Sequence, residues 1–292
     1  MRYHGTVIRP PSEADSLIIQ VTYGCSHNSC DFCGTYLDKP FRVRPFQEVV
    51  EDVRRLPDEL KSTVTKVFLG DGDAVILPRR RLRELLELLH EELPSLQRVS
   101  SYASAQALLK KDVEDLRPLK DLGLTLLYLG LESGDDATLR SCNKGVTVAE
   151  QIEACSRASE AGMQLSVTTV LGLAGEERTV EHARATGRAL SAIDPEYIGV
   201  LSLMVVEGTG LAERVRRGEF KVPGSWAMLR ELRELIDATE VSGALFRSNH
   251  ASNYLPLGGR LPEDKARMLA ALDEALQKEE GSRLRPEAWR AL

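Results

Sequence analysis

The chain has 292 residues, of which 42% are hydrophobic, 28% charged and 5% aromatic, and its formal net charge at pH 7 is -6. This length and apolar content can bury one large core, while the acidic charge and scarce aromatic rings disfavour nucleic acid as a partner. The longest apolar runs, such as Leu124–Leu131, are far shorter than the roughly 20 residues that cross a bilayer, which excludes a membrane partner and predicts a soluble, cytoplasmic protein.

Apolar segments of strand length alternate with longer segments of helical period, a pattern typical of repeated βα units and a parallel sheet. The first expected strand is Leu17–Thr22, and a helix with opposed apolar and charged faces follows at Pro45–Leu56. Further strands are expected at 64–69, 98–103, 125–131, 164–171 and 197–204. Further helices are expected at about 79–92, 106–121, 146–161, 177–191 and 226–239.

Six such units predict an α/β fold, a partial (β/α)6 TIM-like barrel with parallel strands and functional residues at the C-terminal strand ends. Residues 1–241 are expected to form this barrel. Residues 242–292 contain a polar loop and an amphipathic helix over about 263–278, which we expect to pack on the barrel as a C-terminal helical cap within the same domain.

Three cysteines, Cys25, Cys30 and Cys33, fall within nine residues shortly after the first expected strand. Thiolates are the usual ligands of a four-iron cluster, and three of them leave one iron open to bind another molecule. A zinc site with His27 as the fourth ligand is an alternative that this spacing leaves open. A disulfide is disfavoured, because five cysteines are an odd number and a tight cluster in a chain without a signal peptide indicates metal binding or catalysis.

The triplet at the end of a first strand, with the aromatic Phe32 just before its last cysteine, resembles the radical S-adenosylmethionine (radical SAM) superfamily. Four residues separate Cys25 from Cys30, where most members have three, whereas Cys30 and Cys33 keep the usual two. The segment pattern is most similar to the branch of oxygen-independent coproporphyrinogen oxidases and Elongator-type proteins. The resemblance implies a [4Fe-4S] cluster on the three cysteines and SAM on its open iron, with Phe32 among the cofactor-binding residues.

The resemblance also assigns residues that follow successive strands to SAM. The segment Gly70-Asp71-Gly72-Asp73 stands where the family binds the SAM amino group; glycines allow close backbone approach and carboxylates accept from an ammonium group. Glu132 and Ser133 would contact the ribose or the methionine carboxylate, with Ser104 contributing from the neighbouring strand. Gly172 and Leu203 would lie at the adenine. The residues alone leave an alternative for each of these motifs. Residues 70–73 could form an ordinary Asp/Gly turn, Glu132 could be a surface residue, and Gly172 could belong to a strand-to-helix turn.

Four other residues are candidates for a role in the reaction. Cys142, near the predicted mouth of the barrel, is a candidate catalytic hydrogen-atom donor or covalent relay, and the alternative is a cysteine without a role. The loop 246–254 is dense in hydrogen-bonding groups, and its Arg247, His250 and Asn253 are candidates for binding an anionic substrate. A solvated turn is the alternative for this loop.

The resemblance therefore implies an enzyme that works under anaerobic conditions. It would cleave SAM reductively to methionine and a 5′-deoxyadenosyl radical, which abstracts hydrogen from a small-molecule or peptide substrate. An external donor such as flavodoxin or ferredoxin would supply the electron. Two rival hypotheses are a non-catalytic cluster- or haem-binding trafficking protein on the same scaffold and a structural zinc protein.

Overall fold

The computed structural model describes residues 1–278 and 284–291. The chain falls into two compact units. The first unit comprises Met1–Asn28, Thr35–Leu129 and Glu153–Leu165, and the second unit comprises Ser29–Gly34, Gly130–Ile152 and Ser166–Leu292. The fold is α/β, with an eight-stranded, mainly parallel sheet in the strand order β1-β4-β5-β6-β7-β8-β9-β10. The expected α/β class and parallel sheet are confirmed.

The strands of the first unit run parallel to one another. Leu17 of β1 pairs with Val67 of β4, Val67 with Val99 of β5, and Ser100 of β5 with Leu126 of β6. The bounds are β1 Leu17–Gln20, β4 Lys66–Gly70, β5 Arg98–Ala103 and β6 Leu124–Glu132, and a separate two-stranded sheet holds β2 Thr22–Tyr23 and β3 Arg42–Val43. Strands β4 and β6 are mostly apolar, as is typical of buried parallel strands, whereas β5 also buries the polar Ser100 and Ser101.

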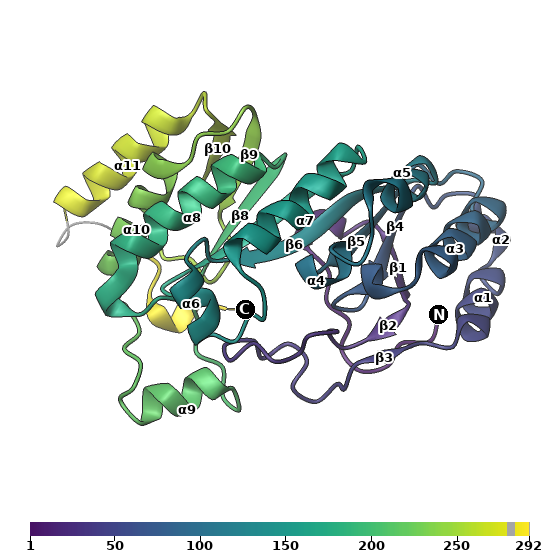
Figure 1. Cartoon of the computed structure of the whole chain (residues 1–292), viewed down its shortest axis with the longest axis horizontal. Helices are drawn as coiled ribbons and strands as arrows, with labels where there is room; N and C mark the ends of the chain where they lie inside the picture. Colours follow the sequence, from purple (N-terminus) through teal and green to yellow (C-terminus); the bar gives the residue numbers. More distant parts are fainter. Residues whose placement is uncertain (279–283, 292) are drawn as a thin grey trace. The chain divides into compact units, whose positions relative to one another are not determined.

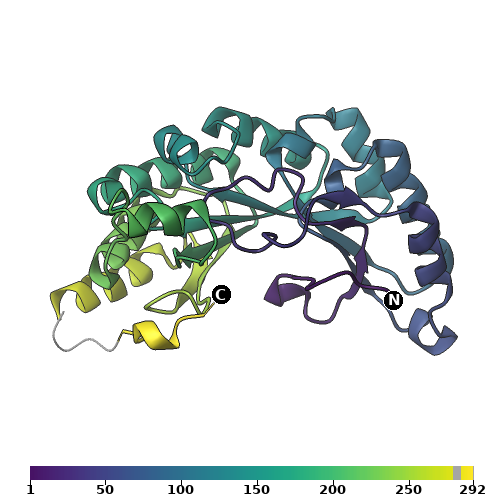
Figure 2. The ribbon, with the colours of Figure 1, turned by 90° about the horizontal axis from the view of Figure 1, so that it is seen from below.

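Helices of the first unit cover one side of its strands, as Figure 2 shows for the blue helices, and the purple N-terminal residues lie on the other side. Leu82, Leu85, Leu86 and Leu89 of α3 are almost fully buried, and each such side chain stabilises the fold by roughly 1.5–3 kcal/mol. Helix α3 packs against both α1 and α5 (Figure 1). The bounds are α1 Phe46–Arg54, α2 Asp58–Lys61, α3 Arg79–Glu92, α4 Ala105–Leu108, α5 Val113–Asp121 and α7 Val148–Glu160, the last with residues in both units.

In the second unit β7, β8 and β9 are parallel and β10 is antiparallel to β9. Helix α10 packs against both α8 and α11 (Figure 1). A Cβ on Gly187 would stand 2.7 Å from Cβ of Ala238, so the absence of a side chain at Gly187 allows α8 and α10 to approach closely. The bounds are β7 Gln164–Leu171, β8 Tyr197–Ser202, β9 Ala244–Ser248, β10 Leu257–Leu261, α6 Asp136–Ser141, α8 Thr179–Ile193, α9 Gly210–Arg216, α10 Ser225–Ala238 and α11 Lys265–Gln277.

The structure differs from the expected elements in several places. The helix expected at about 106–121 is divided into α4 and α5, and the short helices α2, α6 and α9 are additional to the expected ones. The helix expected at 263–278 is α11, but the polar loop expected from residue 246 begins instead with a strand, β9, and β10 follows. Strand β9 contains Arg247 and Ser248, so its short sequence lacks the clean apolar alternation that indicates a strand. The expected strand Leu17–Thr22 is divided into β1 and the short β2. The assignment of residues 242–292 to the same domain as residues 1–241 stays a prediction, and residues 279–283 and 292 lie outside the described residues.

Within residues 1–278 and 284–291, no helix combines the length and the apolar character that a membrane span requires.

A buried carboxylate connects the N-terminus, β1 and α1 in the first unit. Asp52 accepts hydrogen bonds from Arg44 at 2.5 Å and from the guanidinium of Arg2 at 2.7 Å, and Arg44 also donates to the Gln20 carbonyl at 3.1 Å. Burial alone raises the pKa of Asp52, but hydrogen bonds from the Arg2 N–H and from the Arg44 and Arg2 guanidinium groups outweigh burial and lower the pKa from 3.8 to about 2. The ionised form of Asp52 therefore stabilises the folded chain.

We predict that this stabilisation disappears as the pH falls. Because the pKa of folded Asp52 is below its unfolded value of 3.8, the contribution is complete above pH 3.8 and is lost as the pH falls toward 2. Between about pH 5 and pH 3 the free energy of unfolding should fall by about 1 kcal/mol more in the wild type than in Asp52→Asn. Urea unfolding at each pH measures this difference.

The matched control is Asp58→Asn, which removes a carboxylate from an exposed position of the same unit. Its unfolding free energy should follow the wild type across the same pH range. Parallel pH curves for the wild type and Asp52→Asn would contradict the role given to Asp52.

Candidate functional site

The three clustered cysteines lie on residues 24–39, called here the cysteine segment, which follows β2 and ends before β3. Cys25 belongs to the first unit, and Cys30 and Cys33 belong to the second unit. None of the five cysteines, all of which lie among the described residues, forms a disulfide. The three clustered cysteines are partly exposed, whereas Cys142 and Cys155 are buried. The clustered thiols are therefore the ones that solvent can reach.

The chemistry of these thiols fits a metal cluster. A hydrogen bond of 3.1 Å from the Cys33 N–H to the Cys30 carbonyl closes a turn between the two residues. Burial raises the pKa of the Cys30 thiol to about 12, while the charge of Lys144 acts in the opposite direction. A metal must therefore displace the proton of this thiol on binding. Across residues 1–278 and 284–291, no group of three or more His, Cys, Asp or Glu side chains is placed so that it could hold a metal ion. The fit rests on the thiol chemistry and on the spacing.

The predicted SAM residues after β4 contact the cysteine segment within the first unit. Asp73 is fully buried and accepts hydrogen bonds from the hydroxyls of Ser26 at 2.5 Å and Ser104 at 2.6 Å. Burial raises the pKa of Asp73, and these hydrogen bonds oppose that effect. The Ser104 hydroxyl also accepts from the Ala107 N–H at 3.0 Å and so caps α4. Asp73 thus connects Ser26, next to Cys25, with the end of β5.

Asp71 and Gly72 contact the same segment, whereas a Cβ on Gly70 would meet Val7 and Ile18 instead. Asp71 is fully buried in an ion pair of 2.8 Å with Lys39. A Cβ on Gly72 would lie 2.6 Å from the Tyr36 ring and 3.1 Å from Cβ of Cys25. The backbone at Gly72 is therefore in close contact with the cysteine segment. Contact of these residues with SAM stays a prediction.

In the second unit, Glu132 forms an ion pair with Lys144 at 3.0 Å. Glu132 has φ of 61°, a left-handed conformation that non-glycine residues seldom adopt and that often occurs at functional sites. A Cβ at Gly130 would stand 2.0 Å from the Glu132 carboxylate, so Gly130 gives the side chain room to fold back. Burial lowers the pKa of Lys144, but the Glu132 carboxylate and Cys30 together raise it above its ordinary value. A carboxylate and an ammonium group therefore stand side by side at the end of β6.

Ser133 and Cys142 lie close to this pair in the chain and are both buried. The Ser133 hydroxyl accepts from the Asp135 N–H at 3.0 Å in the turn before α6. Burial raises the pKa of the Cys142 thiol to about 12, and its sulfur lies 3.5 Å from the Leu139 carbonyl. The Asp31 N–H donates to the Cys142 carbonyl at 2.9 Å. This bond connects Cys142 to the cysteine segment at the residue directly before Phe32. The roles predicted for Ser133, Cys142 and Phe32 stay predictions.

Gly172 and Leu203 are neighbours, as a shared adenine site requires. The Leu203 N–H donates to the Leu171 carbonyl at 2.8 Å, and a Cβ on Gly172 would lie 3.5 Å from Cβ of Leu203. The Gly172 N–H donates to the carboxylate of Glu231 at 2.8 Å, and Nδ1 of His182 lies 2.8 Å from the same oxygen. Sequence reasoning missed both Glu231 and Lys144. The signal for Glu231 was a carboxylate among the apolar residues of α10, and the signal for Lys144 was a lysine shortly after the Glu-Ser motif.

The three substrate candidates lie in different environments. Arg247 lies on an exposed position of β9. His250 is partly buried, and burial together with the charge of Arg285 lowers its pKa. Asn253 is buried; its amide donates to the Val200 carbonyl at 2.7 Å and its oxygen accepts from Ser202 at 2.8 Å. Asn253 therefore holds the loop against β8, while substrate contact by any of the three stays a prediction.

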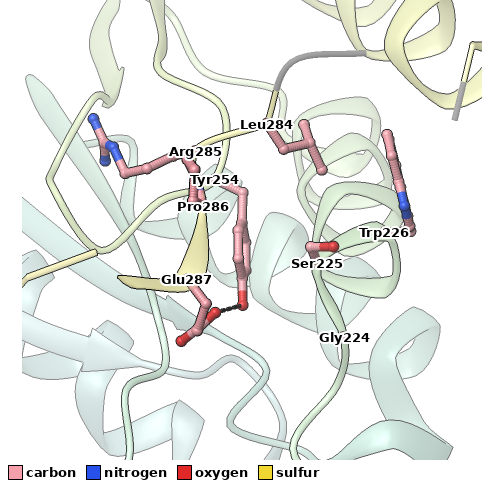
Figure 3. Close-up of a pocket in the computed structure, with 8 residues that line it drawn as sticks. All are labelled: Gly224, Ser225, Trp226, Tyr254, Leu284, Arg285, Pro286 and Glu287. Carbon is pink, nitrogen blue, oxygen red and sulfur yellow. Dashed lines mark hydrogen bonds between the residues drawn. The ribbon is translucent and has the colours of Figure 1, made fainter. Parts of the chain in front are cut away.

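A surface pocket of about 510 Å³ lies in the second unit, at the start of α10 (Figure 3). The Tyr254 hydroxyl in its wall donates to Glu287 at 2.5 Å. Arg285, also in the wall, donates to the carbonyls of His250, Ala251 and Asn253 at 2.7–2.9 Å. None of the residues that line this pocket is among the site residues expected from the sequence, because the pocket brings together segments far apart in the chain. The lining residues are Gly224, Ser225, Trp226, Tyr254, Leu284, Arg285, Pro286 and Glu287.

A family model described as the Radical SAM superfamily matches residues 19–185, more than half of the chain. The chain belongs to the radical SAM superfamily. The cofactors of this family are a [4Fe-4S] cluster and SAM. The match includes all three clustered cysteines and the residues after β4, β5, β6 and β7 that the resemblance assigns to SAM.

Known proteins with sequences similar to this radical SAM chain are named for different functions. The heme chaperone HemW of Bacillus subtilis is 23% identical over 68% of this chain and 53% of its own length. A tRNA-2-methylthio-N(6)-dimethylallyladenosine synthase of Roseiflexus is 29% identical over 74% of this chain and 46% of that protein. The chain thus spans about half the length of these curated relatives.

The solved structure of coproporphyrinogen III oxidase (HemN) from Escherichia coli has the same fold. It matches with a TM-score of 0.57 and 18% identity over 76% of this chain and 51% of that chain. This similarity confirms the coproporphyrinogen oxidase branch as a structural neighbour of this radical SAM chain.

We predict that Gly72→Ala destabilises the radical SAM chain by about 1–3 kcal/mol, because the new methyl group would overlap the Tyr36 ring and crowd Cys25. Urea unfolding measures the change. Gly243→Ala is the control, since a Cβ there would meet no atom within 4 Å and should leave the unfolding midpoint nearly unchanged. Equal midpoints for the two variants would show that Tyr36 is not held against Gly72.

Proposed function

We propose that the chain is a radical SAM enzyme in which Cys25, Cys30 and Cys33 hold the [4Fe-4S] cluster. The observation that carries the proposal is three partly exposed cysteines within nine residues, on a segment bound to the carboxylates that follow β4. When bound, the two cofactors supply reductive cleavage of SAM and a 5′-deoxyadenosyl radical that abstracts hydrogen from the substrate. The chain's own residues would bind and orient SAM.

The residues around the predicted SAM site have defined tasks in this proposal. Glu132 would accept hydrogen bonds from the ribose hydroxyls, and the neighbouring Lys144 would bind an anionic group of the methionine moiety. The backbone at Gly72 would face the SAM amino group. Gly172 and Leu203, held next to each other, would contact the adenine. Cys142 is buried and its thiol is protonated at neutral pH, as a hydrogen-atom donor must be.

The partners of the proposed enzyme follow from its chemistry and charge. An external electron donor such as flavodoxin or ferredoxin would reduce the cluster. One relative is named for tRNA modification, but the net charge of -6 supports a small-molecule or peptide substrate for this chain. Cysteines without disulfides suit the reducing cytoplasm.

A second candidate function is haem or cluster trafficking without catalysis. The similarity to the heme chaperone HemW of Bacillus subtilis favours it. This candidate predicts tight haem binding and little SAM cleavage, and His27 and His250 are the candidate haem ligands. The structural zinc alternative predicts instead a colourless protein with one zinc ion.

We predict that the reconstituted wild type, reduced with dithionite under anaerobic conditions, converts SAM to 5′-deoxyadenosine and that Cys30→Ala does not. Removing one of three thiolate ligands should abolish stable cluster binding. Iron content and chromatographic detection of 5′-deoxyadenosine are the measurements.

The control is Cys155→Ala, which removes a buried thiol of α7 outside the cysteine segment and should keep both iron and activity. A wild type that binds the cluster and haem but forms no 5′-deoxyadenosine would favour trafficking. A colourless wild type containing zinc would refute the cluster.

We also predict that Glu132→Gln weakens SAM binding to the reconstituted protein by about tenfold or more, because the substitution removes a charged acceptor and the ion pair with Lys144. Equilibrium dialysis with SAM measures affinity, and iron content should not change. Glu234→Gln, which breaks a pair with the exposed Arg184, is the control and should bind SAM like the wild type. Unchanged affinity in Glu132→Gln would exclude Glu132 from the SAM site.

A further inference from the structure

We propose that Asp71 is a positioning residue that fixes both ends of the cysteine segment, rather than a direct contact of SAM. This inference deepens the proposed function and rests on it, because the segment matters in this way only if it holds the cluster. The evidence lies entirely within the first unit, in the contacts of Asp71 with Gly24, Tyr36 and Lys39.

Asp71 joins the start of the cysteine segment to its end. Its Oδ2 accepts from the Gly24 N–H, directly before Cys25, at 3.4 Å. At the other end, Lys39 donates to the same oxygen at 2.8 Å and the Tyr36 hydroxyl donates to Oδ1 at 3.1 Å. One carboxylate therefore binds the residues that flank all three clustered cysteines.

The two ends also meet directly. Gly24 has φ of 67°, and a Cβ there would stand 2.3 Å from the Lys39 carbonyl oxygen, so only glycine allows the backbones to approach this closely. The Gly72 N–H donates to the Gly24 carbonyl at 3.1 Å, and the Asp71 N–H donates to the Thr22 hydroxyl at 3.2 Å. The first residue of the cysteine segment, Gly24, is thus bound to the residues that directly follow β4.

The carboxylate oxygens of Asp71 already accept hydrogen bonds from other residues of the protein. Gln20 donates to Oδ2 at 3.3 Å, in addition to Lys39 and Gly24, and Tyr36 occupies Oδ1. A carboxylate offers about four acceptor positions, so little capacity remains for the ammonium group of SAM. The side chain is also fully buried. These contacts suit a residue that acts on the cofactor through the cysteine segment.

Burial makes the Lys39–Asp71 pair sensitive to substitution. Lys39 is 4% exposed and Asp71 is 0% exposed, and Lys39 also donates to the Thr6 carbonyl. Removing one partner of a buried pair leaves the other charge without compensation, which is strongly destabilising. The test must therefore separate loss of stability from loss of cluster positioning, and it needs a milder variant as well.

The experiment compares Asp71→Asn and Tyr36→Phe with Glu13→Gln after anaerobic reconstitution. Tyr36→Phe keeps the ring and both charges but removes one hydrogen bond to Asp71. Glu13→Gln is the matched control, because it breaks another pair with a fully buried carboxylate, to Arg98 at 2.8 Å, in the same unit. The measurements are the rate of iron transfer to excess bathophenanthroline disulfonate, the electron paramagnetic resonance spectrum of the reduced cluster, and urea unfolding of the metal-free protein.

We expect Asp71→Asn to release iron about ten to one hundred times faster than the wild type, as substitutions that disturb the support of metal ligands do, with an altered resonance spectrum. Tyr36→Phe should show the same effect to a smaller degree with near-normal unfolding. Glu13→Gln should unfold at lower urea but keep the wild-type release rate and spectrum.

Two results would overturn the inference. If Tyr36→Phe and Asp71→Asn load iron and release it at the wild-type rate, Asp71 does not position the cysteine segment, although the wild type would still support the proposed function. If all three variants release iron in proportion to their loss of unfolding stability, Asp71 acts only through the fold. A wild type that takes up no cluster would instead refute the proposed function itself, and the inference with it.

Discussion

The buried carboxylate of Asp71 is the contact on which the arrangement of the cysteine segment depends. It binds Gly24 before Cys25 and Lys39 after Cys33, and it lies directly after β4. Tyr36 is the buried hydrophobic residue of this segment, and polar contacts with the end of β4 add to its burial. Asp73 adds a second contact of this kind through Ser26. A strand of the sheet thereby determines where the segment begins and ends.

A similar principle holds at the end of β6 in the second unit. Glu132 adopts a left-handed conformation, Gly130 leaves space for its carboxylate, and Lys144 compensates its charge. A charge that is largely removed from water needs a partner, so the ion pair holds a carboxylate and an ammonium group together at this strand end. A carboxylate also stabilises the turn at Gly172 after β7, because Glu231 of α10 accepts a hydrogen bond from the Gly172 N–H. Strand ends with polar supports of this sort are the positions where parallel α/β folds place their chemistry.

Family membership and specific reaction rest on different evidence. The radical SAM match covers residues 19–185, where the cysteine segment and most predicted SAM residues lie. Relatives that share this part of the chain include a heme chaperone and a tRNA-modifying enzyme, and the chain spans about half of each. The shared part accounts for the cofactors. The reaction depends on residues that contact the substrate, and these differ between proteins built on one scaffold.

Local patterns in the sequence determined the class of fold and the cofactors. Alternating apolar and helical segments indicated the parallel sheet, and Cys25, Cys30 and Cys33 indicated the cluster family, because both signals lie between residues close in the chain. The strand β9 escaped prediction, since Arg247 and Ser248 obscure its alternation. The pairing of Asp71 with Lys39 and of Gly172 with Glu231 also escaped prediction, as each joins residues more than thirty positions apart. Only the tertiary structure decided which carboxylates form hydrogen bonds with distant parts of the chain and which could bind a ligand. The physical reason is that burial and distant partners arise only when separate strands and helices pack together.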